Sequence, residues 1–119
     1  MSSELSKLFL YKIQEMVRNK HRHFVQRNDY PDGNYIQQLA KLGITPSEAW
    51  NYILKLDESH YVDGPSIDVT CRTRSKEKVV WTFKMEIDGN IAYIKLKDES
   101  ERRGCVCLSF HKDHPEWAN

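Results

Sequence analysis

Side chains able to act on a phosphodiester gather in the last third of the sequence. An imidazole exchanges protons near neutral pH, an ammonium group binds phosphate, and a phenol stacks on a base or donates a hydrogen bond. RNA carries a 2′-hydroxyl group that can attack its own phosphate, so such a set needs neither a metal ion nor a protein nucleophile. The candidate catalytic residues are Lys84, Tyr93, Lys95 and His111.

Further basic residues are candidates for binding the RNA backbone. They are Arg22, Arg27, Arg72, Arg74 and Lys97. The arginine pair at 72 and 74 lies in a polar segment, where two guanidinium groups can clamp one phosphate. The basic stretch that holds residues 22 and 27 also suits acidic groups of a protein partner. Taken singly, each of these charges is more often a solvated surface residue.

Strand alternation predicts that these side chains share one face of a sheet. In segment 81–87, alternation places Lys84 on one face and the apolar residues on the other, namely Trp81, Phe83, Met85 and Ile87. In segment 91–97, one face carries Tyr93, Lys95 and Lys97, and the other carries Ala92, Ile94 and Leu96. In segment 105–111, one face carries Cys105, Cys107, Ser109 and His111, and the other carries Val106, Leu108 and Phe110. We expect the apolar sets to pack on helices, although a plain solvated sheet surface also explains the polar sets.

The rest of the chain predicts the elements that hold this sheet. Helical spacing of apolar residues indicates helices at about 3–20 and 35–42, followed by a third that begins at Thr45 and ends near Asp57. Its start is a capping box, with Pro46 in the first turn and Glu48 at the third position. Strands are expected at 79–87, 91–96 and 105–111, with a weaker one between 61 and 71. Residues 1–119 are therefore predicted to form one α+β domain, with N-terminal helices packed on one face of a C-terminal antiparallel sheet.

The composition is that of an ordinary globular domain. Charged residues make up 29% of the 119 residues, and the net charge is only +1. No apolar run approaches the roughly 20 residues that span a bilayer, and the first residues lack the features of a secretory signal. We therefore expect a cytoplasmic protein without a membrane partner. The spacing of the cysteines and histidines predicts free thiols and neither a metal site nor a cofactor.

Several of these motifs together resemble a known family. They are Trp81-Thr82-Phe83-Lys84, Tyr93-Ile94-Lys95-Leu96-Lys97, Val106-Cys107-Leu108-Ser109-Phe110-His111 and the upstream segments 39–44 and 56–61. Their order and spacing, over most of residues 12–111, are similar to the MqsR family of bacterial type II toxins. The resemblance implies a RelE-like fold, sequence-selective cleavage of mRNA and a cognate antitoxin as partner. Tyr93 corresponds to the family's active-site tyrosine, whereas Val62 and Thr82 replace a lysine and a glutamine of the family pattern.

Two other functions fit the same residues. The polar sheet face suits a non-catalytic module that binds RNA, which predicts salt-sensitive binding without cleavage products. A protein-interaction module, such as an inactive toxin relative or a phage-encoded inhibitor, predicts a stable protein complex and no affinity for RNA.

Overall fold

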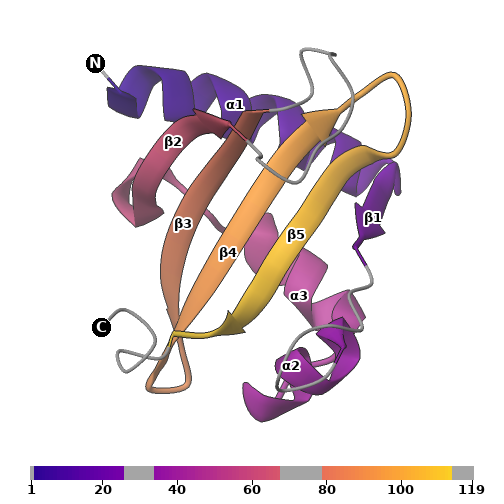
Figure 1. Cartoon of the computed structure of the whole chain (residues 1–119), viewed down its shortest axis with the longest axis vertical. Helices are drawn as coiled ribbons and strands as arrows, with labels where there is room; N and C mark the ends of the chain where they lie inside the picture. The colour runs from indigo at the N-terminus through magenta and orange to yellow at the C-terminus, as the bar shows by residue number, and fades with distance from the viewer. Residues whose placement is uncertain (1, 26–33, 68–78, 114–119) are drawn as a thin grey trace.

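The computed structural model describes residues 2–25, 34–67 and 79–113, and within them it has an α+β architecture (Figure 1). Its helices are α1 (Ser2–Arg18), α2 (Tyr35–Lys41), α3 (Pro46–Ile53) and the short 3₁₀ helix η1 (Glu58–His60). Its strands are β1 (Arg22–Phe24), β2 (Tyr61–Ile67), β3 (Val79–Ile87), β4 (Asn90–Glu99) and β5 (Gly104–Lys112). The predicted helices precede β2 to β5, as expected, but the short strand β1 lies between α1 and α2.

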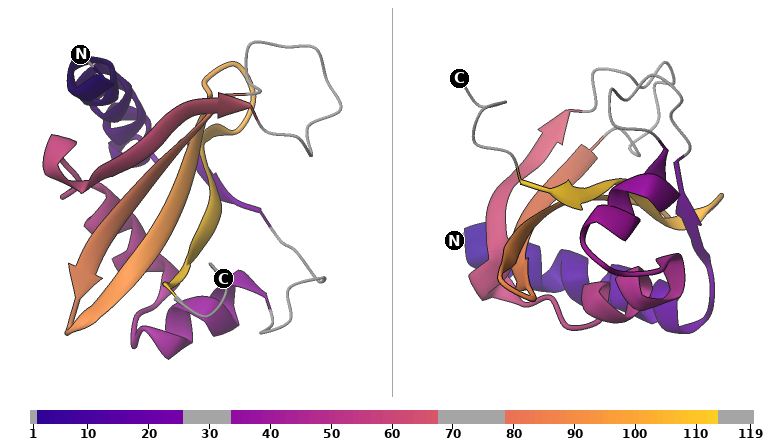
Figure 2. Two further views of the ribbon diagram at one scale, coloured as in Figure 1. Left: turned by 60° about the vertical axis from the view of Figure 1, so that its left-hand side comes forward. Right: turned by 90° about the horizontal axis from the view of Figure 1, so that it is seen from below.

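The strands form one sheet in the order β1-β5-β4-β3-β2. Strands β2 to β5 pair antiparallel, as expected, but β1 pairs parallel to β5. The prediction of a purely antiparallel sheet is therefore wrong, because the chain leaving α1 supplies a fifth strand at the free edge of β5. The helices α1 and α3 lie on the same side of this sheet, as both views in Figure 2 show.

The ends of α3 follow from side chains that satisfy backbone groups. At its start, the Thr45 hydroxyl accepts from the backbone N–H of Glu48, whose carboxylate accepts from the backbone N–H of Thr45. This confirms the predicted capping box. The helix ends at Ile53, earlier than predicted. There the amide nitrogen of Gln14, on α1, lies 3.0, 3.3 and 2.9 Å from the carbonyl oxygens of residues 53, 54 and 56.

The hairpin between β3 and β4 fixes the register of the sheet. Asp88 and Gly89 have φ values of 50° and 84°, as in the tight turn that suits the twist of two antiparallel strands. Pairing then continues without interruption from Ile87 opposite Asn90 to Val80 opposite Lys97. All side chains of these two strands consequently keep the alternation predicted from the sequence.

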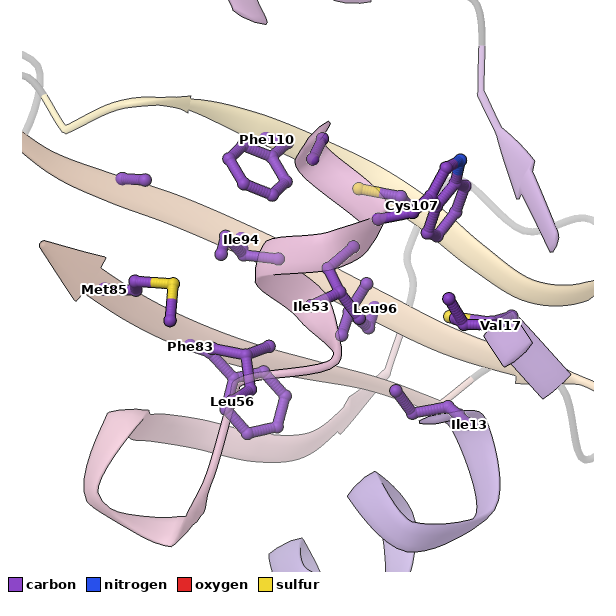
Figure 3. Close-up of a cluster of buried hydrophobic side chains, with 14 of the residues drawn as sticks. Ile13, Val17, Ile53, Leu56, Phe83, Met85, Ile94, Leu96, Cys107 and Phe110 are labelled. Carbon is purple, nitrogen blue, oxygen red and sulfur yellow. The ribbon is translucent and has the colours of Figure 1, made fainter. Parts of the chain in front are cut away.

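The hydrophobic core lies between the helices and one face of the sheet, as Figure 3 shows. Its fully buried members include Ile13 and Val17 from α1 and Ile53 from α3. The sheet contributes Phe83, Met85, Ile94, Leu96, Cys107 and Phe110. We call the opposite face, which is turned away from the helices, the outer face.

A bulge in β5 reverses part of the predicted alternation. Lys95 pairs with Ser109 but Leu96 pairs with Cys107, so Leu108 is an extra residue in the ladder. Before the bulge, the two cysteines of β5 therefore face the helices, and Val106 and Leu108 pack with Val80 in a second cluster. The predicted faces are correct from Ser109 onward and wrong for residues 105–108.

Candidate functional site on the outer face

Three of the four candidate catalytic residues form a row across three strands. Lys84 on β3 lies directly opposite Tyr93 on β4, and Tyr93 lies directly opposite His111 on β5. Directly opposed residues point to the same face of a sheet, and here that is the outer face. Lys95 lies one row further along, between Thr82 and Ser109.

The two rings at the centre of this row stack on each other. The ring centroids of Tyr93 and His111 are 5.3 Å apart and their planes differ by 22°. The His111 Nδ1 lies 2.9 Å from the carbonyl oxygen of Lys112. A carbonyl oxygen only accepts, so Nδ1 donates this hydrogen bond, and the neutral ring then carries its basic lone pair on Nε2.

Two lysines neighbour Tyr93 on the outer face. The Lys95 Nζ lies 5.8 Å from the centroid of the Tyr93 ring, in a cation–π arrangement. The Lys84 Nζ lies 3.0 Å from the Oδ2 of Asp113. The side chains of Lys84, Tyr93, Lys95 and His111 are all half-buried, so each keeps part of its surface in contact with solvent.

The structure separates Lys97 from this group. Lys97 shares the outer face, but only 4% of its surface is exposed, and its Nζ lies 3.1 Å from the Oε2 of Glu99. It packs in register between Val80 and Val106. The expectation of a solvated lysine that binds phosphate is corrected here, because Lys97 is enclosed in an ion pair.

Glu99 is the centre of this second charged group. It is fully buried, and the Arg103 guanidinium donates to both carboxylate oxygens, at 2.8 Å each. The hydrogen bonds from Arg103, aided by Lys97 and opposed by burial, lower the pKa of Glu99 to about 2. The pKa of His23, on strand β1, is also lowered. Burial of the imidazole is the larger cause and the positive charge of Arg103 is the smaller one.

The structure also separates Arg22 from the outer face. Arg22 pairs in register with Cys105, which faces the helices. Its guanidinium donates to the carbonyl of Val17 and lies 5.5 Å from the centroid of a Trp50 ring, on α3. Arg22 therefore stabilises the helical side and does not join the tyrosine and histidine. The three other predicted RNA-binding residues, Arg27, Arg72 and Arg74, lie outside the described residues.

One functional candidate was missed by reasoning from the sequence. Asp113 follows β5, and its backbone N–H donates to the carbonyl of Ile91 at 2.7 Å, which extends the pairing with β4. The predicted strand ended at His111, two residues earlier. Had the alternation been continued, residue 113 would have fallen on the same face as His111.

Other features of the described residues lie away from this row. Residues 2–25, 34–67 and 79–113 contain no group of three or more His, Cys, Asp or Glu side chains placed to hold a metal ion. A cavity of about 440 Å³ lies between α1 and η1, lined by Leu10, Tyr11 and Leu56 among others, and none of the four candidates lines it. In the part of the chain that the structure describes, no helix is both long and apolar enough to span a membrane.

No family model, curated protein or solved structure matches the chain. A basic imidazole nitrogen, a phenol and two ammonium groups on one accessible face are the groups needed to move a proton and to stabilise negative charge on a phosphate.

Proposed function

We propose that this protein is a metal-independent endoribonuclease that cleaves mRNA. One observation carries the proposal: Tyr93 and His111 stack across β4 and β5 on the outer face, with Lys84 directly opposite Tyr93 and the Lys95 ammonium group over the Tyr93 ring. The four residues come from three strands whose pairing fixes their mutual positions. Strands paired in register favour catalysis, because the backbone positions that carry the four groups need no rearrangement when substrate binds.

The proposed reaction is an internal transesterification of RNA. His111 Nε2 takes the proton from a ribose 2′-hydroxyl, whose oxygen then forms a bond to the adjacent phosphorus. The bond between phosphorus and the 5′-oxygen breaks, and that oxygen leaves with a proton from one of the two ammonium groups. Lys84 and Lys95 stabilise the charge that builds on the phosphate, and the Tyr93 phenol positions it. The products are a 2′,3′-cyclic phosphate and a 5′-hydroxyl.

The biological setting of the proposal rests on the motifs that resemble the MqsR family. It is a toxin of a type II toxin–antitoxin system, with a RelE-like fold, acting in the cytoplasm and neutralised by a cognate antitoxin protein. The α+β arrangement, with helices on one sheet face and the candidate site on the other, is compatible with this setting.

The test is cleavage of a mixed-sequence RNA in the presence of EDTA. We expect fragments ending in 2′,3′-cyclic phosphate, and no fragments from a fully 2′-O-methylated RNA. His111→Ala should lower the rate by about 100-fold or more, as expected for the loss of a general base. Lys95→Ala should lower it by about tenfold or more, as expected for the loss of one charged group at the phosphate.

The matched control is Lys55→Ala. Lys55 Nζ lies 5.3 Å from the centroid of the Tyr52 ring, so this variant removes a lysine from a similar aromatic contact on the helical side. Its rate should equal that of the wild type. Binding of RNA without fragments from the wild type would overturn the nuclease and favour the non-catalytic RNA-binding module. Absence of both binding and cleavage would favour the protein-interaction module.

A further inference from the structure

The ion pair of Lys84 crosses a whole strand. Lys84 lies on β3 and Asp113 follows β5, with β4 between them. Neighbouring strands are about 4.8 Å apart, so the two backbones are separated by about 10 Å. The 3.0 Å contact between Nζ and Oδ2 therefore brings the Lys84 and Asp113 side chains together between β3 and the end of β5, over β4. The ammonium group consequently lies on the outer face, which also carries the stacked rings of Tyr93 and His111.

Asp113 is well placed to fix that group. Its backbone N–H continues the ladder with Ile91, and it lies two residues beyond His111 on the same face. Its side chain is about 30% exposed, so the ion pair is partly shielded from solvent. A lysine side chain otherwise samples many rotamers, and holding it in one of them costs conformational entropy.

We propose that Asp113 is a positioning residue, which holds the Lys84 ammonium group beside Tyr93 and His111 for the phosphate at the cleavage site. This inference rests on the proposed function. An ammonium group has three N–H donors, so one can be directed at the carboxylate while others are directed at phosphate oxygens. The carboxylate thus orders the lysine before the substrate arrives.

If Asp113 affected the site only through its charge, removing its carboxylate would help the reaction, whereas a positioning role predicts a slower reaction. A negative charge near the site repels the RNA backbone, and its loss should strengthen binding. Glu86 provides the matched control, because it lies on β3 two residues from Lys84, on the same face, and is exposed. Neutralising Glu86 removes a nearby charge without touching the ion pair of Lys84.

The experiment compares kcat and KM for RNA cleavage by the wild type, Asp113→Asn and Glu86→Gln. We expect Asp113→Asn to lower kcat by about tenfold, equivalent to about 1.4 kcal/mol, without raising KM. Glu86→Gln should leave kcat unchanged. The double variant Lys84→Ala/Asp113→Asn should be no slower than Lys84→Ala alone, because Asp113 acts through the lysine. Asp113→Glu should recover part of the lost rate.

Unfolding midpoints are measured for every variant, and Asp113→Ser replaces Asp113→Asn if the latter does not fold. The inference is overturned if the Asp113 variants keep the wild-type kcat, or if their loss adds in full to that of Lys84→Ala. In either case the activity of the wild type still supports the proposed nuclease. A wild type that is inert in the same assay overturns the proposed function, and the role of Asp113 with it.

Discussion

The buried carboxylate of Glu99 gives the sharpest prediction for stability. Both of its oxygens accept from Arg103 at 2.8 Å, and Lys97 contacts it at 3.1 Å. Glu99 and Lys97 are almost entirely removed from solvent. Replacing Glu99 with Gln removes the buried carboxylate that Lys97 and Arg103 contact, and breaking a buried ion pair in this way typically costs about 3–5 kcal/mol.

The pH dependence of this effect follows from the pKa of Glu99. The pKa falls from the usual 4.5 in the unfolded chain to about 2 in the folded protein. Since a tenfold change in an equilibrium constant corresponds to about 1.4 kcal/mol, this difference contributes about 3 kcal/mol to the free energy of unfolding. Because the folded pKa is depressed, the contribution is complete above pH 4.5 and is lost as the pH falls through about 2.

The assay is urea denaturation of the wild type and Glu99→Gln at a series of pH values. The difference between their free energies of unfolding should be constant at neutral pH and shrink by about 3 kcal/mol as the pH falls from 4.5 to below 2. Other carboxylates titrate in both proteins, so they cancel in the difference. Glu101→Gln, which neutralises an exposed carboxylate in the same turn, should show no such change. Parallel curves for the wild type and Glu99→Gln below pH 4.5 would refute the reasoning.

Two further variants test the packing around the sheet. Gly104→Ala would drive a Cβ into the backbone carbonyl of His21. It should cost well over the roughly 1 kcal/mol expected for Gly89→Ala, because Gly89 has a similar positive φ but open space around it. Equal urea midpoints for these two variants would contradict that contact. Gln14→Leu removes the donors to the carbonyls at the end of α3 and should lower the free energy of unfolding by about 1–3 kcal/mol. An unchanged midpoint would show that water replaces the amide.

Local signals in the sequence were enough to predict most elements. The limits of β3 match the run from Val79 to Ile87, because a β-rich segment is followed directly by the turn residues Asp88 and Gly89. The start of α3 follows from the Thr45 capping box. The placement of Tyr93 and His111 on one face was also predictable, since both lie on the regular side of the bulge.

The remaining features depend on contacts between distant parts of the chain. Nothing in the alternation of residues 105–111 marks Leu108 as the extra residue, because a bulge is set by how two strands fit together. Lys97 has the same local pattern as Lys95, and only its pairing with Glu99 in three dimensions explains its burial. Segment 21–27 is readable from the sequence as either a short basic link or a strand, but the parallel pairing of β1 with β5 was not predicted, because three residues carry too short a pattern to show a pairing partner.

The interior position of β5 in the sheet has a consequence for how the protein is made. This strand is translated after the other four, yet it lies between β1 and β4 and carries His111. A nascent chain that stops before β5 holds β1 without its neighbour, leaves an edge of β4 open and lacks the imidazole. Premature termination before β5 should thus yield fragments with unpaired strand edges that are prone to aggregate, and the outer face is completed only when β5 has been added to the sheet.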